Sequence, residues 1–150
     1  MYRILFSLIL TITTLNCFAQ EDENAIKSVI NNMFNGMRTS DSGLIRSAFA
    51  PKAILQTIMK NKEGKVMVRS EVVDSFIIAV SRVHKEIYDE RITFDLIKVD
   101  ADLAIVWTPY QFFIDEKFSH CGVNSFQLVR LNGEWKIQYL IDTRRRQDCK

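Results

Sequence analysis

Three side chains of types that transfer protons lie in the C-terminal half of the chain: Tyr110, His120 and Asp142. Each falls in a segment rich in β-branched and aromatic residues, which predicts strands. Asp142 ends the last of these segments, and a carboxyl group in an apolar mouth can shuttle protons. Alternatively, Arg144 or Arg145 could hold Asp142 in a salt bridge, since both are close in sequence.

The two aromatic candidates also have alternative roles. His120 could be a general acid or base, because histidine titrates near neutral pH, or a surface residue beside the turn at 115–117. Tyr110 could donate a hydrogen bond to a developing oxyanion, and Pro109 predicts an edge or a bulge that aims Tyr110 inward. The turn hides the register, so the sequence does not place both residues on one face. The other histidine, His84, is expected at a helix end, where a cation complements the helix dipole.

Further polar or flat side chains are predicted to line a ligand pocket. Trp107 would offer a flat face to a ring, and Tyr110 and Asp142 would contribute again. Arg144 opens a basic C-terminus, which is either a solvated tail or an anion-binding rim, because arginine forms forked bonds with carboxylate and phosphate. The complete predicted ligand-binding set is Gln56, Trp107, Tyr110, Asn124, Asp142 and Arg144.

Cys121 and Cys149 are the cysteines of the main domain, and an even pair in an oxidising compartment predicts a disulfide. Two free thiols, or a bridge between chains, are the alternatives. No metal-ligand spacing, phosphate loop, nucleophile elbow or dinucleotide fingerprint is found in the sequence. We therefore predict no metal and no cofactor.

The first nineteen residues resemble a signal peptide. Arg3 precedes an apolar run, and Ala19 is the small residue expected before the cleavage site. We predict cleavage after Ala19, a secreted or periplasmic protein and no membrane contact afterwards. A retained helix is one alternative; a lipoprotein attached through Cys17 is another, disfavoured because Asn16 is not the small residue a lipobox requires.

Residues 20–150 have the size of one domain. The formal net charge of the whole chain is +2, and Gly and Pro number only five and two. The charge gives no general attraction to nucleic acid, and no aromatic-and-basic stripe suggests one. The scarcity of Gly and Pro argues against long linkers.

Apolar periodicity predicts three amphipathic helices, at 24–38, 42–50 and 71–84. Asp22 or Asn24 could cap the first helix and Ser70 the third. The predicted strands are 53–59, 65–68, 87–99, 103–114, 118–131 and 134–142. Asn132-Gly133 is a strong hairpin signal. Helices followed by consecutive hairpins predict an α+β fold, with an antiparallel sheet covered on one face.

Two segments resemble the nuclear-transport-factor-2-like superfamily, which includes SnoaL-like and ketosteroid-isomerase-like proteins. They are Ala48-Phe49-Ala50-Pro51-Lys52-Ala53 and the terminal hairpin from Phe126 to Ile137. His120-Cys121-Gly122-Val123 and the ending from Asp142 to Arg146 resemble its putative lumazine-binding branch.

The resemblance implies a cystatin-like cone: a curved antiparallel sheet, packed against N-terminal helices, with a cavity at its open end. It also implies pairing of two copies through the sheet. The function expected is non-catalytic binding of a small hydrophobic or aromatic ligand. One alternative is a cofactor-independent isomerase, dehydratase or cyclase that uses Asp142, His120 and Tyr110; another is a dimeric scaffold without ligand. Fold alone does not decide among them.

Overall fold

The computed structural model describes residues 2–82 and 86–149, with side chains from Gln20 onward. The helices in this part are α1 (Tyr2–Thr39), α2 (Ser42–Ala48) and α3 (Val73–Ser81). The strands are β1 (Phe49–Lys60), β2 (Val66–Val72), β3 (Tyr88–Ile92), β4 (Leu96–Asp100), β5 (Leu103–Ile114), β6 (Lys117–Leu131) and β7 (Glu134–Thr143). The chain is therefore α+β, as predicted.

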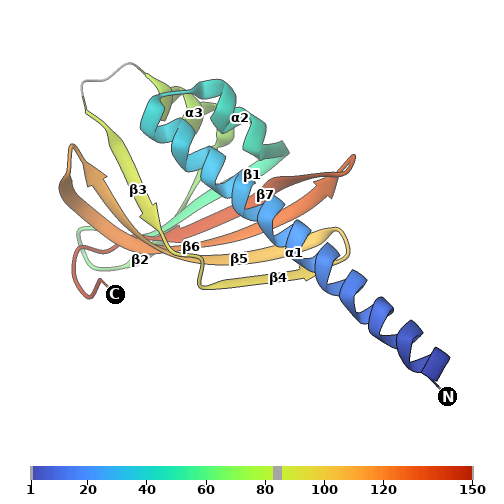
Figure 1. Ribbon diagram of the computed structural model, residues 1–150. Helices are drawn as coiled ribbons and strands as arrows, with labels where there is room; N and C mark the ends of the chain where they lie inside the picture. Colours follow the sequence, from blue (N-terminus) through green and yellow to red (C-terminus); the bar gives the residue numbers. More distant parts are fainter. Residues whose placement is uncertain (1, 83–85, 150) are drawn as a thin grey trace.

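The strands form one curved sheet in the order β2-β1-β7-β6-β5-β3, with β4 also paired to β5 (Figure 1). The prediction of a purely antiparallel sheet is wrong at one place, because β1 and β7 run parallel. No hairpin sets the direction of this pair, since most of the domain lies between the two strands. The β6–β7 hairpin is confirmed: Asn132 and Gly133 both have positive φ, as a tight hairpin turn requires.

The three helices lie on one side of the sheet and cover its concave face (Figure 1). The predicted apolar stripe of α1 is the buried stripe, and Phe34 meets Phe126 of β6 edge-to-face at a centroid distance of 6.3 Å. Alternation along β5 places Ala104, Val106 and Thr108 inward, whereas the residues between them are exposed. The core therefore lies between the helices and the concave face of the sheet.

Several predicted helix ends differ from the structure. Asp22 and Asn24 lie inside α1, and Asp22 instead accepts hydrogen bonds from Arg130 at 2.7 Å and Trp135 at 3.3 Å. Helix α2 ends at Ala48, ahead of Pro51, because strand pairing with β7 begins at Phe49.

The third helix also differs from its prediction. Ser70 lies in β2, where its hydroxyl binds Gln56, so it does not cap α3. Helix α3 ends at Ser81, and the predicted role of His84 lies outside the described residues.

The strand predicted at 87–99 is two strands, β3 and β4, which pair with different parts of β5. The interruption at 93–95 lies opposite Pro109, whose carbonyl accepts from the Thr93 amide at 3.0 Å. Proline has no amide hydrogen to donate to a continuous ladder, which accounts for the break.

Candidate functional site

A row of polar side chains crosses the concave face of the sheet. Backbone pairing aligns Thr108 of β5 with Asn124 of β6, Asn124 with Asp142 of β7, and Asp142 with Thr57 of β1. All four residues are buried. Asp142 is thus held in the middle of the sheet, facing the helices.

The carboxylate of Asp142 has several partners. Its Oδ1 accepts from the Thr57 hydroxyl at 2.6 Å, and its Oδ2 accepts from Arg144 Nε at 3.0 Å. The hydroxyl of Tyr110 lies 3.2 Å from Oδ2 and 2.9 Å from the carbonyl oxygen of Thr143. That hydroxyl has one hydrogen, so it donates to one acceptor at a time. The salt bridge anticipated for Asp142 is therefore present, to Arg144.

Tyr110 occupies space left free by Gly122, its partner on β6. A Cβ atom at position 122 would lie 2.7–2.8 Å from the ring and hydroxyl of Tyr110, and would overlap the Thr143 carbonyl. The close approach therefore requires glycine. Burial, and then the nearby charges of Asp142 and Glu90, raise the pKa of Tyr110 far above its usual value, so its hydroxyl stays protonated.

Glu90 of β3 faces the same row and was not among the predicted residues. Its Oε1 accepts from Asn124 Nδ2 at 2.8 Å. Burial raises the pKa of Glu90 to about 7; the charge of Asp142 adds to the rise, and Asn124 and Arg144 oppose it. This carboxyl therefore changes charge near neutral pH.

His120 of β6 lies on the same face as Tyr110. Its ring stacks on Phe112 at a centroid distance of 4.8 Å and meets Tyr110 edge-on at 5.8 Å. The ring is partly buried, so His120 is not merely a surface residue beside a turn. Desolvation, and then the charges of Arg144 and Arg146, lower the pKa of His120, which favours the neutral imidazole.

Most of these groups, though not Thr108 or Tyr110, line a cavity of about 260 Å³ between the sheet, α1 and α3, which we call the inner cavity. Its polar wall contains Thr57, Glu90, His120, Asn124, Asp142 and Arg144. Its apolar wall includes Phe34, Leu55, Phe76, Phe112 and Leu140. The catalytic alternative requires Asp142, His120 and Tyr110 to meet at one cavity. Asp142 and His120 do line the inner cavity, whereas Tyr110 does not line it and lies behind Asp142, with its hydroxyl 3.2 Å from Oδ2.

Of the other predicted pocket residues, Trp107 lies outside the inner cavity and Gln56 lies at its border. Trp107 is on the outer face of β5, 43% exposed, so its predicted place in the pocket is wrong. Gln56 borders the cavity, but its amide hydrogen-bonds Ser70 and Tyr139. Since Gln56 lies between the inward-facing Leu55 and Thr57, strand alternation directs its side chain outward.

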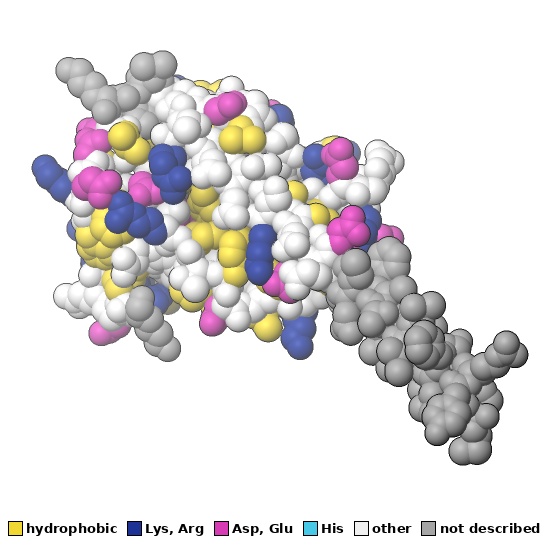
Figure 2. All heavy atoms as spheres, viewed as in Figure 1, with side chains coloured by type: hydrophobic (Ala, Val, Ile, Leu, Met, Phe, Trp, Pro, Cys, Tyr) yellow, Lys and Arg dark blue, Asp and Glu magenta, His cyan; other side chains and the backbone are white. Residues whose placement is uncertain are grey.

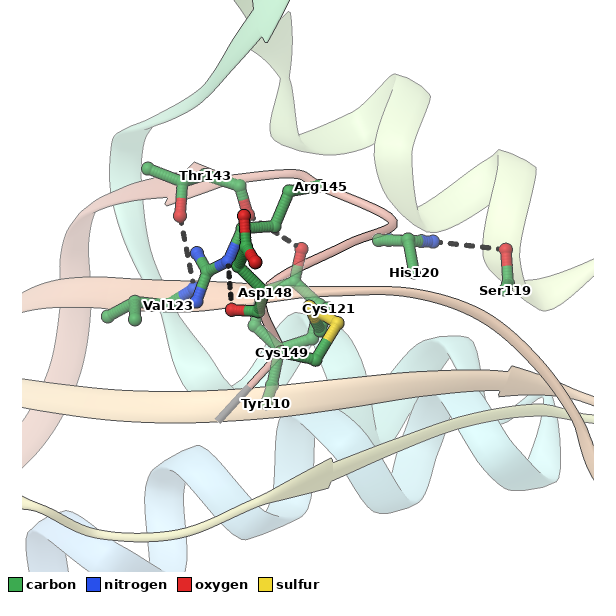
Figure 3. Close-up of a disulfide and its surroundings, with 9 residues drawn as sticks. All are labelled: Tyr110, Ser119, His120, Cys121, Val123, Thr143, Arg145, Asp148 and Cys149. Carbon is green, nitrogen blue, oxygen red and sulfur yellow. Dashed lines mark hydrogen bonds between the residues drawn. A yellow bond between two sulfur atoms is a disulfide. The ribbon is translucent and has the colours of Figure 1, made fainter.

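The disulfide predicted between Cys121 and Cys149 is present (Figure 3). Backbone hydrogen bonds of 2.9 Å in both directions also join Cys121 to Arg145. The arginines after β7 are thus tied to β6 twice. No cluster of potential metal ligands occurs among the described residues. In that same part of the chain, no helix is long and apolar enough to cross a membrane.

A curved sheet with helices on its concave face and a cavity between them defines a nuclear-transport-factor-2-like protein. Within that class, the sequence matches the model of a family described as putative lumazine-binding over residues 21–139, and the chain belongs to that family. No curated protein matches the chain significantly.

Solved structures support the class. A conserved protein of Planctomyces limnophilus superposes with a TM-score of 0.68 at 17% identity, covering 84% of this chain and 98% of that one. NTF2-like proteins of unknown function from Silicibacter pomeroyi and Shewanella baltica give TM-scores of 0.66 and 0.64 at 16% and 15% identity. They cover 85% and 83% of this chain, and 98% and 94% of their own. At these identities the likeness shows the fold alone.

Proposed function

We propose that this chain is a secreted or periplasmic domain that binds a small, largely apolar ligand in the inner cavity, without turning it over. The observation that carries the proposal is a cavity of about 260 Å³ with one apolar wall and one wall of hydrogen-bonding groups. Cavities of this kind are the usual sites for small molecules. The partners of Asp142 within the protein favour binding over catalysis, because they occupy both of its oxygens.

The proposed compartment has separate support. Disulfides persist in oxidising compartments and are rare in the cytosol, and the Cys121–Cys149 bridge fits the leader predicted at residues 1–19. Pairing of two copies through the sheet also stays a prediction. The outer face of β5 exposes Leu103, Ile105 and Trp107, which would supply an apolar contact. On the face drawn in Figure 2, by contrast, hydrophobic side chains lie among charged groups of both signs.

Filling part of the inner cavity should weaken binding. Ala79 of α3 lines the cavity, whereas its neighbour Ile78 is 55% exposed and does not. We expect Ala79→Phe to weaken binding of the neutral fluorophore N-phenyl-1-naphthylamine at least tenfold, which corresponds to about 1.4 kcal/mol. Ile78→Phe adds a ring to the same helix and should leave fluorescence titrations unchanged. Equal titrations for wild type and both variants would contradict the proposal.

A second candidate function, cofactor-independent proton transfer, is favoured by Glu90. A carboxyl group with a pKa of about 7 in the wall of a cavity is suited to general base catalysis. Elimination of 5-nitrobenzisoxazole is a suitable probe, because a base removes the C3 proton while the N–O bond breaks to give a cyanophenolate. If Glu90 is the base, Glu90→Gln should lower the rate at pH 8 at least tenfold. Glu21→Gln changes an exposed side chain on α1 and should leave the rate unchanged. If wild type catalyses the elimination no faster than buffer alone, this candidate is ruled out.

A further inference from the structure

A second hollow of about 650 Å³ adjoins the inner cavity, and we call it the basic cleft. It lies where β7 ends, beside the last residues of β1. Its charged wall is Lys60, Arg144, Arg145 and Arg146, and no Asp or Glu of the described residues lines it. The basic C-terminus seen in the sequence is therefore folded against the sheet.

The cations of the basic cleft are largely unneutralised. Arg144 pairs with Asp142 through Nε. Among the described residues, the ion pairs include neither Lys60 nor Arg145 nor Arg146. The side chain of Arg145 donates to the Asp148 carbonyl at 3.1 Å, a neutral acceptor. Three positive charges thus face one hollow without a carboxylate partner there.

The basic cleft and the inner cavity share two lining residues, His120 and Arg144. The floor of the cleft is also apolar, made of Ile58, Met59 and Val66. A fully hydrated inorganic ion would gain nothing from such a floor. An anion attached to an apolar body would use both the floor and the cations.

The backbone that carries Arg145 and Arg146 is held in place before any ligand arrives. Arg145 is paired through its backbone with Cys121, and the disulfide fixes the chain three residues after Arg146 (Figure 3). Groups that are already ordered lose little conformational entropy on binding. A solvated tail would lack this advantage.

From these contacts we infer that the ligand is an organic anion: its apolar body occupies the inner cavity, and its carboxylate, sulfonate or phosphate group binds Lys60, Arg145 and Arg146 in the basic cleft. The inference rests on the proposed function and adds the chemical class of the ligand. Arginine forms charge-assisted, forked hydrogen bonds with such oxyanions.

Two fluorescent probes test the inference. 8-Anilino-1-naphthalenesulfonate and N-phenyl-1-naphthylamine have the same ring system, and only the first carries a negative charge. At low ionic strength the anionic probe should bind wild type about tenfold more tightly, and added salt should reduce that preference. Lys60→Gln/Arg146→Gln changes two exposed side chains that form no ion pair with any described residue, and should reduce the preference to about equal affinity. Arg145→Gln should reduce the preference for the anionic probe about fivefold.

A matched control removes two charges elsewhere: Lys52→Gln/Lys98→Gln should keep the full preference. The inference fails, while the proposed function stands, if the neutral probe binds but the anionic probe binds no more tightly. It also fails if the control lowers the preference as much as Lys60→Gln/Arg146→Gln does. If the neutral probe does not bind, and Ala79→Phe leaves the anionic probe unaffected, the proposed function fails and the inference with it.

Discussion

Replacing Cys149 with serine should lower the free energy of unfolding by about 3 kcal/mol. The bridge joins residues 28 apart in sequence, so it closes a sizeable loop in the unfolded chain. Cys149 is the better position to change, because Cys121 is only 1% exposed and its replacement would disturb the core as well. Urea denaturation of residues 20–150, followed by tryptophan fluorescence, measures the effect directly.

Wild type treated with dithiothreitol provides the internal control for this prediction. Reduction opens the same bridge without changing a side chain, so reduced wild type and Cys149→Ser should unfold at the same urea concentration. Adding dithiothreitol to Cys149→Ser should leave the urea midpoint of the variant unchanged. A wild-type midpoint that does not move on reduction would mean that the bridge adds nothing to stability.

The helices and the long C-terminal strands were predictable because each shows a strong local pattern. The stripe containing Ile26, Ile30 and Met33 is buried as its spacing predicts. The parallel pairing of β1 with β7 was not predictable from local patterns, since it joins segments on either side of the domain. The end of α2 was missed because strand pairing at Phe49, and not Pro51, stops the helix.

The residues of the site could be predicted only where the sequence shows which face of the sheet each strand residue occupies. Asp142 and Arg144, at or just after the end of β7, and Asn124, in the middle of β6, do lie at the cavity. Trp107 and Tyr110 are three residues apart on one strand, so alternation could not place both inward. Applying that rule consistently would have excluded Trp107.

Sequence reasoning misses Glu90 because the composition of 87–99 predicts one continuous strand and singles out no carboxylate in it. Its neighbours two residues away, Tyr88 and Ile92, are both partly buried. A carboxylate alternating with such residues is the signal that could have identified it. The rise in its pKa depends on the fold around it, including Asp142 from β7, which no local pattern reveals.

Glu90→Gln should stabilise the protein at pH 8 and have little effect at pH 4. In the unfolded chain this carboxyl titrates near 4.5, and in the folded protein its pKa is about 7. Below pH 4.5 both states are protonated, so the group makes no pH-dependent contribution. Between these values unfolding releases a proton, so stability falls as the pH rises. Above pH 7 the folded protein holds a buried carboxylate, at a cost of about 2–3 kcal/mol.

Glutamine keeps the shape and the oxygen that accepts from Asn124 Nδ2, but it cannot ionise. The variant should therefore gain about 2–3 kcal/mol over wild type at pH 8, and the gain should shrink through the window from pH 7 to pH 4.5. Urea denaturation at several pH values measures this difference. Glu21→Gln, on the exposed side of α1, should shift stability little at any of these pH values. A gain from Glu90→Gln that is the same at pH 4 and pH 8 would show that the side chain is not a buried acid, and the proton-transfer candidate would lose its base.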